Sequence, residues 1–313
     1  MARFAPVVIT IEHLSKRYGD TLAVNDLSFE VRPGVVTGFL GPNGSGKSTT
    51  MRVIMGLDAP TSGSVTVNGH RYRDLHAPLR EVGALLDAKA VHPGRTARNH
   101  LRALAASNRI PVRRVDEVLE FTGIAAVADK KVGGYSLGMA QRLGIAGALL
   151  GDPPVLLFDE PVNGLDPEGI RWIREFFRAL AIEGRTVFVS SHLMSEMAQS
   201  ADEIIVIGRG RFITQNTVDG LTASVNGTVL VRSADNATLR RALEANGASV
   251  DVANDGTLTA RGSSAEAIGT VALGAGVALY ELTPQRISLE EVFMDLTADA
   301  VEYASTFESK HHD

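Results

Sequence analysis

One loop carries the residues of this chain that are best suited to bind a phosphate group. Residues 41–49 read Gly-Pro-Asn-Gly-Ser-Gly-Lys-Ser-Thr and fit the pattern Gly-x4-Gly-Lys-Ser/Thr without a mismatch. Glycines let successive backbone N–H groups point at one anion, and a following helix adds a partial positive charge. Lys47 would reach the β- and γ-phosphates of a nucleotide, and the Ser48 hydroxyl would bind Mg²⁺. The predicted phosphate-binding residues are Gly41, Pro42, Asn43, Gly44, Ser45, Gly46, Lys47, Ser48 and Thr49.

The segments on either side of this loop are those that a phosphate-binding loop requires. The apolar run 35–40 predicts a buried strand, and residues 48–55 predict the start of a helix. The alternative is an ordinary glycine-rich turn, which needs neither neighbour. Because strand, loop and helix follow one another in order, we favour the phosphate-binding loop.

A second candidate element is an apolar strand that ends in two acids. Residues 155–160 read Val-Leu-Leu-Phe-Asp-Glu. In a parallel sheet the carboxyl end of such a strand lies beside the ligand. Asp159 would hold Mg²⁺ directly or through water, and Glu160 would orient or deprotonate an attacking water. A solvated acidic turn before Pro161 is the alternative, but a magnesium–nucleotide site needs a carboxylate element of this kind.

Composition limits the classes of protein to which the chain can belong. Its 313 residues favour two domains, and 44% hydrophobic with 21% charged residues is typical of a globular protein. The net charge of −5 argues against a general nucleic-acid binder. The chain has no cysteine, which excludes disulfides, thiol catalysis and cysteine metal sites. No run reaches the roughly 18 apolar residues that span a bilayer, so a membrane role would need another chain to do the spanning.

Hydrophobic patterns predict an α/β core that must position these residues. Strands are predicted at 7–11, 27–31 and 35–40, and another, bounded by turn residues, at 63–67. Continuous apolar runs, which are typical of buried parallel strands, follow at 155–158, 186–190 and 204–207. Residues 168–182 predict a helix. Residues 96–150 are helical in pattern, apart from a Gly133-Gly134 break, and predict an inserted helical subdomain.

A second module follows residue 218. Strands are predicted at 228–232, 249–252, 257–260 and 277–282, and helices at 237–245 and 264–273. This β-α-β-β-α-β order is that of a ferredoxin-like unit. A Ser288 cap predicts a last helix at 288–296. We therefore expect a nucleotide-binding domain at 1–218, an accessory or regulatory domain at 219–300 and a loosely held tail at 301–313.

Three further motifs point to one family. Residues 135–142, Tyr-Ser-Leu-Gly-Met-Ala-Gln-Arg, resemble the signature of ATP-binding cassette (ABC) proteins and lie about 90 residues after Lys47. Residues 163–166, Asn-Gly-Leu-Asp, resemble the D-loop, and 190–192, Ser-Ser-His, resemble the switch histidine. With the phosphate loop and the two acids, all stand in the family's order over about residues 7–215. The ending at 289–296 and the Ser-Leu-Gly-Met form of the signature resemble ABC-2 type ATPases, which include daunorubicin and bacitracin exporters.

The resemblance implies that the chain works as a head-to-tail dimer that binds ATP between two copies. Ser136 and the backbone of Gly138 would then contact the γ-phosphate held by the partner. His192 would contact the γ-phosphate and position Glu160, so that Lys47, Glu160 and His192 form the catalytic set. Taken alone, His192 is better interpreted as a hydrogen-bonded core residue. Its place after an apolar strand and a serine pair favours the catalytic role.

Two more residues receive roles from the resemblance. Tyr18 matches the aromatic residue that stacks on adenine, with an ordinary surface tyrosine as the alternative. Asp166 would bridge the two nucleotide sites, and it is also placed to cap the helix that opens at Pro167; both roles can hold together.

The sequence departs from the family pattern in two places. Asp87 stands where the family usually has a glutamine that senses the γ-phosphate and Mg²⁺. A carboxylate can bind Mg²⁺, but it would repel the γ-phosphate unless the metal intervenes. Leu137 and Met139 replace the usual glycine and glutamine of the signature, whereas the contacting positions Ser136 and Gly138 are kept. We expect ATP binding and turnover to survive both changes.

These features predict the ATPase subunit of an exporter, peripheral at the cytoplasmic face of the cell membrane. Its partners would be separate membrane permease subunits and a second ATPase, either identical or paralogous, with no nucleic acid. The C-terminal module would regulate the dimer, stabilise it, or be purely structural. The alternative is a soluble ABC ATPase acting on ribosomes or DNA. Such proteins carry two cassettes or a long coiled-coil insertion, and neither is present. A kinase would leave the signature and His192 unexplained.

Overall fold

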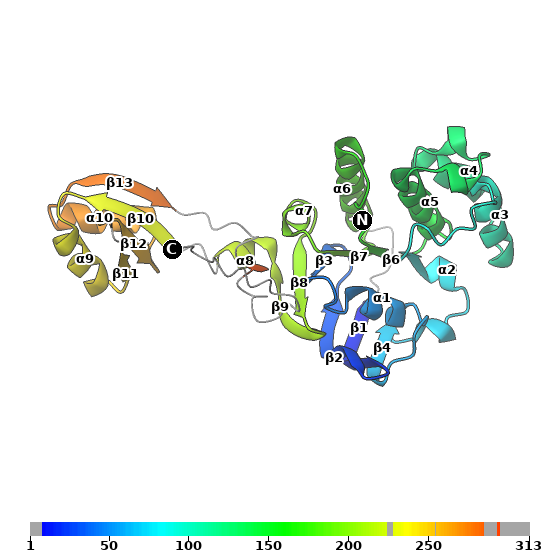
Figure 1. Ribbon diagram of the computed structural model, residues 1–313, viewed down its shortest axis with the longest axis horizontal. Coiled ribbons are helices and arrows are strands. Elements are labelled where there is room, and N and C mark those ends of the chain that lie inside the picture. Colours follow the sequence, from blue (N-terminus) through cyan, green and yellow to red (C-terminus); the bar gives the residue numbers. More distant parts are fainter. Residues whose placement is uncertain (1–7, 224–227, 254, 285–292, 295–313) are drawn as a thin grey trace, which may run out of the picture. The chain divides into compact units, whose positions relative to one another are not determined.

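The computed structural model describes residues 8–223, 228–253, 255–284 and 293–294, and the chain divides into two units. The first unit runs to Asn216 and the second from Thr217 to Asp295 (Figure 1). The predicted helix 288–296, apart from residues 293–294, and the predicted tail 301–313 lie outside the described residues.

The first unit is built around a six-stranded sheet. In spatial order the sheet contains β5 (Val82–Leu85), β6 (Val155–Asp159), β7 (Thr186–Ser191), β3 (Val36–Leu40), β8 (Glu203–Gly208) and β9 (Arg211–Thr217). The first five strands in this order pair in parallel, as expected for short apolar runs that are buried on both faces.

The register of this sheet brings three strand ends to one level. Leu40, the last residue of β3, lies opposite Ser191 of β7, and Asp159, the last residue of β6, lies opposite Ser190. The segments that follow β3, β6 and β7 therefore leave the same edge of the sheet. Ligands of parallel α/β sheets bind at this edge.

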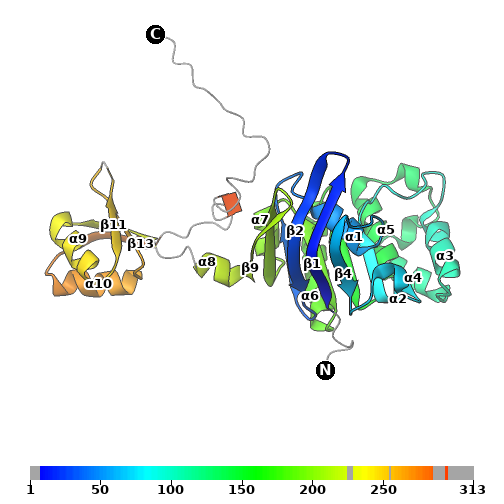
Figure 2. The ribbon, with the colours of Figure 1, turned by 90° about the horizontal axis from the view of Figure 1, so that it is seen from below.

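The first unit also contains an antiparallel sheet, formed by the strands predicted at 7–11, 27–31 and 63–67. β2 (Thr21–Val31), β1 (Ile9–Tyr18) and β4 (Ser62–Val67) pair antiparallel in that spatial order (Figure 2). Apolar residues of β2 face the core while their neighbours are exposed, which is the alternation of a half-solvated antiparallel sheet. The same alternation is present in the sequence at 27–31, Leu-Ser-Phe-Glu-Val.

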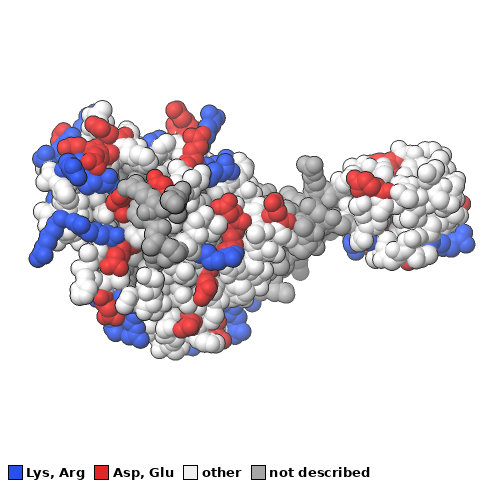
Figure 3. Space-filling view, turned by 180° about the vertical axis from the view of Figure 1, so that it is seen from behind, with Lys and Arg blue, Asp and Glu red and all other residues white. Residues whose placement is uncertain are grey.

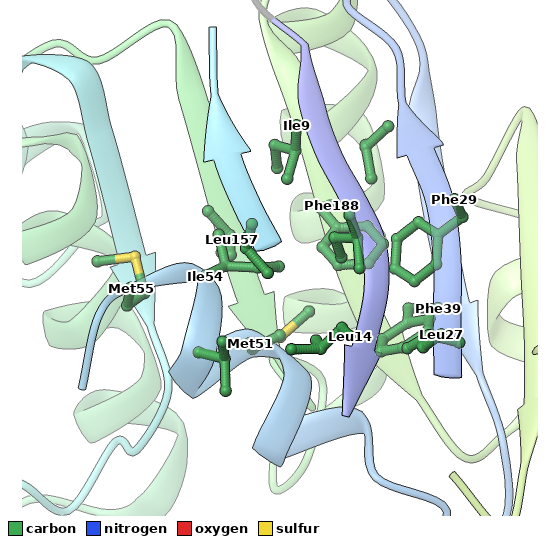
Figure 4. Close-up of a cluster of buried hydrophobic side chains, with 14 of the residues drawn as sticks. Ile9, Leu14, Leu27, Phe29, Phe39, Met51, Ile54, Met55, Leu157 and Phe188 are labelled. Carbon is green, nitrogen blue, oxygen red and sulfur yellow. The ribbon is translucent and has the colours of Figure 1, made fainter. Parts of the chain in front are cut away.

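Aromatic side chains join the two sheets. The rings of Phe29, Phe39 and Phe188 lie with centroids 5.0–5.9 Å apart. Met51 and Ile54 of helix α1 (Lys47–Ile54) belong to the same cluster (Figure 4). The helix that begins at the phosphate loop is thus fixed through its buried face, which stabilises the position of the loop.

Helices complete the first unit. The rings of Phe176 and Phe177 in α6 (Pro167–Ile182) pack on Phe158 of β6. The predicted helical subdomain contains α3 (Ala97–Ser107), α4 (Arg113–Phe121) and α5 (Leu137–Leu149), which gather at one end of the unit (Figure 1). Shorter elements are α2 (Pro78–Glu81), α7 (Met194–Ala198) and 3-10 turns at Tyr72–Asp74, Ala125–Val127 and Val132–Gly134. Among the described residues, no helix combines the length and apolar character needed to cross a bilayer.

The second unit follows the predicted β-α-β-β-α-β order after a short helix, α8 (Val218–Ala223). Its antiparallel sheet has the spatial order β11-β12-β10-β13. Leu239, Leu243 and Ile268 of the two main helices pack on one face of this sheet. The elements are β10 (Thr228–Ser233), α9 (Asn236–Ala245), β11 (Ser249–Val252), β12 (Leu258–Arg261), α10 (Ala265–Gly274) and β13 (Leu279–Pro284).

Candidate active site

A cavity of about 520 Å³ lies at the carboxyl edge of the parallel sheet. Its volume is within the usual range for small-molecule sites. It brings the predicted phosphate loop together with predicted residues from three other segments. The lining residues are Tyr18, Ala23, Asn43, Gly44, Ser45, Gly46, Lys47, Ser48, Thr49, Glu160, Asn163 and His192.

The loop needs its glycines at two positions. Gly46 has φ +101°, and a Cβ there would lie 2.6 Å from the Ala23 carbonyl oxygen. A Cβ on Gly41 would lie 2.4 Å from Ser45 Oγ. Only glycine allows this close backbone path. The narrow loop therefore wraps its N–H groups around one small volume, as an anion site requires.

The amino end of α1 is left without a side-chain cap. Its N-cap residue is Gly46, and no acidic residue stands in the first turn. By contrast, Ser136 caps α5 and Asp166 caps α6 with their own oxygens. The first N–H groups of a helix need an acceptor. At α1 a bound anion can supply it.

Lys47 is the cation of this cavity. It is only 6% exposed, and its Nζ donates to the carbonyl oxygens of Gly41 at 2.7 Å and Pro42 at 3.2 Å. Burial lowers the pKa of Lys47, while the nearby carboxylates of Glu160 and Asp159 partly oppose that shift. A phosphate group would oppose it further, because it brings more negative charge to the ammonium.

Ser190 fixes the two acids at the end of β6. Its Oγ donates to Asp159 Oδ1 and accepts from the Glu160 N–H at 3.0 Å. Glu160 itself has φ +48°, a left-handed conformation that a residue with a side chain rarely adopts. This strained backbone is held in place by its neighbours and directs the carboxylate into the cavity, as is common at functional sites.

The Glu160 carboxylate lies between two nitrogen groups. Its Oε2 is 2.8 Å from His192 Nδ1, and its Oε1 is 3.8 Å from Lys47 Nζ. A further acid, Glu196, lies close by on α7. Burial raises the pKa of its carboxyl, and the Ser191 hydroxyl opposes that rise.

Tyr18 also lines the cavity and is 44% exposed. Its hydroxyl donates to Asp58 Oδ2 at 2.7 Å, and the same carboxylate accepts from Arg52 Nε at 2.7 Å. Lys16 Nζ lies 4.7 Å from the ring centroid. The ring is therefore held in one orientation and keeps exposed surface on which a base can stack.

Seven predicted residues do not line this cavity: Gly41, Pro42 and Asp159, and the four described next. Ser136 Oγ accepts from the Met139 N–H at 3.2 Å and Asp166 Oδ1 from the Gly169 N–H at 2.8 Å, so both act as helix caps. Gly138 follows in the first turn of α5. Asp87 is exposed, and its Oδ1 accepts from the Lys89 N–H at 2.8 Å. The roles of all four toward a nucleotide stay predictions.

The expected Mg²⁺ ligands are few. Within the described part of the chain, no three histidine or acidic side chains are grouped closely enough to hold a metal by themselves. Ser48 and Asp159 are the protein oxygens at the cavity edge that the motif assigns to the ion. Mg²⁺ usually takes one or two carboxylates together with substrate phosphates and water. The residues present fit that pattern, with a nucleotide supplying the other ligands.

Some residues of the site received no role from the sequence. In the sequence, Ser190 and Asn163 stand only as parts of motifs, yet the first holds both acids and the second lines the cavity. Asp58, which orients Tyr18, is also part of the site. No motif marks it, because its contact with Tyr18 joins residues 40 positions apart.

Known proteins match both units. A family model described as "ABC transporter" matches residues 24–163. A second model, described as a domain of unknown function, matches residues 227–290. The second unit therefore resembles a recurring domain whose role is not assigned.

Relatives and solved structures agree with the first match. The bacitracin transport ATP-binding protein BcrA of Bacillus licheniformis is 40% identical over 217 residues, covering 68% of this chain and 71% of the relative. The daunorubicin resistance ATP-binding protein DrrA3 of Streptomyces coeruleorubidus is 34% identical over 307 residues, covering 94% and 97%. The dimeric structure of MJ0796, a bacterial ABC transporter cassette, has TM-score 0.62 at 25% identity, covering 67% of this chain and 98% of that structure.

Proposed function

This chain belongs to the ABC transporter family as an ATP-binding subunit, and from that premise we propose that it hydrolyses ATP to drive export through separate membrane subunits. The observation that carries the proposal is Glu160. Its carboxylate stands in the phosphate-loop cavity between Lys47 and His192. A carboxylate in that place suits a base that orients and activates water toward a γ-phosphate.

Each residue around Glu160 has a distinct task in this proposal. Lys47 and the loop N–H groups neutralise the phosphates, which lowers the barrier to attack. His192 holds the Glu160 carboxylate in the orientation that a water molecule needs. Ser190 fixes the side-chain carboxylate of Asp159 and the backbone N–H of Glu160. Mg²⁺, when bound by Ser48, Asp159 and phosphate oxygens, would add positive charge where negative charge develops.

We place Ser136, Gly138 and Asp166 in the nucleotide site of a second copy. None of them lines the cavity of its own chain, which agrees with a role across a dimer interface. The similarity to a dimeric cassette supports this arrangement. The signature serine would then sense the γ-phosphate of the partner, and hydrolysis would remove the contact and release the dimer. Asp87 would contribute to the Mg²⁺ environment only if its loop moved toward the nucleotide.

Export is favoured by the relatives of this chain, which are named for bacitracin transport and daunorubicin resistance. The cargo would be bound by the membrane subunits, with this chain peripheral at the cytoplasmic face. On the described face of the first unit, acidic and basic side chains are intermixed, without the basic stripe that nucleic-acid binding requires (Figure 3). We also propose that the unit after residue 218 is a ferredoxin-like accessory domain that regulates or stabilises the ATPase dimer.

The test is an affinity purification of the tagged full-length Glu160→Gln variant from its own cells, with ATP and mild detergent. The substitution should trap the ATP-bound closed dimer, so a stoichiometric membrane protein with several spans should copurify. Glu244→Gln, on the surface of the second unit, is the matched control. Addition of ATP should not increase the amount of the membrane protein that copurifies with it. Ribosomal proteins or DNA-repair factors in its place would overturn the transport proposal and leave the ATPase assignment intact.

A further inference from the structure

Gln141 is a buried polar side chain that the proposed mechanism does not use. It lies in the second turn of α5 and is 5% exposed. Its Nε2 donates to two backbone carbonyl oxygens, that of Glu160 at 3.4 Å and that of Asn163 at 3.3 Å. Its Oε1 is buried and has no hydrogen-bond partner. One amide group therefore links the helical subdomain to the turn that carries the proposed base.

Leu137 makes a second link between the same two segments. Gly164 has φ +77°, and a Cβ on it would lie 2.2 Å from Leu137 Cδ2. A Cβ on Gly138 would lie 3.2 Å from the Gly164 carbonyl oxygen. The first turn of α5 thus rests directly on the loop that follows the two acids. Leu137 departs from the glycine usual at its position, and Gly164 leaves the space that its side chain occupies.

Both contacts join the start of α5 to the segment that follows β6. We infer that Gln141 and Leu137 join the start of α5 and the turn after β6 into one unit, with Gln141 as a positioning residue for Glu160. The inference rests on the proposed function, because it takes Glu160 as the base and the start of α5 as the signature. A displacement of the α5 end is then passed to the Glu160 backbone of the same chain, and the reverse also holds.

Stability alone does not account for the amide at this position. A buried oxygen without a partner costs free energy, so an apolar side chain of equal volume would serve packing as well or better. The amide N–H groups are needed only to hold the carbonyls of Glu160 and Asn163. Glu160 has a left-handed backbone, and such a conformation persists only where its surroundings fix it.

The test is Gln141→Met in the full-length chain, a neutral change of similar volume that removes the amide group and both of its hydrogen bonds. We expect the kcat for ATP hydrolysis to fall about tenfold, the Kd for ATP to stay within about twofold, and the Tm to stay equal or rise. Gln215→Met is the matched control. The Gln215 amide also donates to a backbone carbonyl, that of Glu30 at 3.1 Å, but it is exposed and outside the cavity. Its kcat should stay at the wild-type value.

Two results would overturn the inference. One is a folded Gln141→Met protein with a wild-type kcat. The other is a Gln141→Met protein in which kcat and ATP affinity fall by similar factors. A wild-type chain that binds ATP without hydrolysing it would instead count against the proposed function.

A second set of variants decides the matter if Gln141→Met does not fold. Gly164→Ala should lower kcat at least about threefold more in the wild-type background than in Leu137→Gly, because only Leu137 clashes with the new methyl group. The strain from positive φ is the same in both backgrounds and cancels. Equal effects in the two backgrounds would show that the Leu137 contact carries no coupling.

Discussion

The two units of this chain differ in whether they bury charged side chains. The first unit buries Lys47, Arg185 and Glu203 and holds Glu160 in a strained conformation beside a cavity. Among the described residues of the second unit, no charged side chain is buried. Its ion pairs, such as Arg240 with Glu244, lie on the surface.

The difference indicates where chemistry takes place. A buried charge costs free energy unless partners compensate for it, and such groups cluster at functional sites. The second unit has a purely apolar core and open ion pairs that contribute little to stability. We therefore expect the first unit to carry all steps of ATP hydrolysis. The second unit would act on that reaction only through its surface.

The largest expected effect separates folding of the second unit from catalysis by the first. Leu243→Ala removes a side chain that is 1% exposed in the core of the second unit. It should lower the free energy of unfolding of that unit by about 2–5 kcal/mol. Calorimetry should show the transition of that unit at a lower temperature, and below that temperature the rate of phosphate release should stay within about twofold. A loss of ATPase activity well beyond twofold would contradict the division of tasks between the units.

His192→Ala should lower kcat for ATP hydrolysis about 100-fold, because Glu160 loses the group that orients its carboxylate. Steady-state phosphate release against ATP concentration measures this. His13→Ala is the matched control, since His13 Nδ1 makes a similar contact of 2.9 Å with Asp26 on the exposed surface. Equal losses in both variants would mean that the His192 contact is only structural.

Tyr18→Ala should weaken ATP affinity about 5- to 100-fold, which corresponds to the roughly 1–3 kcal/mol that stacking of a base contributes. Equilibrium binding of ATP measures it. Tyr18→Phe keeps the ring and should stay within about threefold of wild type. Tyr280→Ala, at a 73% exposed position in the second unit, should change nothing. If Tyr18→Ala binds ATP normally, the residue is an ordinary surface tyrosine.

The smallest effect concerns pH. Hydrogen bonds from Arg52 and then Tyr18 hold the pKa of Asp58 below its ordinary value of 3.8. The contribution of Asp58 to stability is therefore complete above about pH 3.8 and is lost as the pH falls through the lower folded pKa. Asp58→Asn should lower the Tm of the first unit by about 1–2 °C at pH 7. In melts at decreasing pH, the Tm of the wild type should approach that of Asp58→Asn. A Tm difference that stays constant with pH would show that the Asp58 carboxylate is not the cause.

The sequence predicts well which segments meet at the cavity, because their signals are local. The phosphate loop, Asp159, Glu160 and His192 each follow an apolar strand, and parallel strands end at one edge. Contacts between distant segments carry no such signal. The bond from Tyr18 to Asp58 and that from Gln141 to Glu160 depend on how loops meet in space.

The fold shows the same limit. Buried strands such as β6 and β7 were predicted nearly to their ends, since every residue is apolar or faces the core. The strands predicted at 7–11 and 27–31 belong to a hairpin that extends to Tyr18 and begins again at Thr21. Its outer part carries Lys16 and Arg17 and has no apolar pattern. The exposed strand β9 was missed for the same reason.

The most direct test of the account is single-turnover ATP hydrolysis by the full-length Glu160→Gln variant beside the wild type. We predict that both bind ATP with affinities within about threefold, and that the variant converts bound ATP to ADP at least about 100-fold more slowly. That result would assign the chemical step to the carboxylate between Lys47 and His192. Conversion by the variant at the wild-type rate would contradict it, because the base would then lie elsewhere.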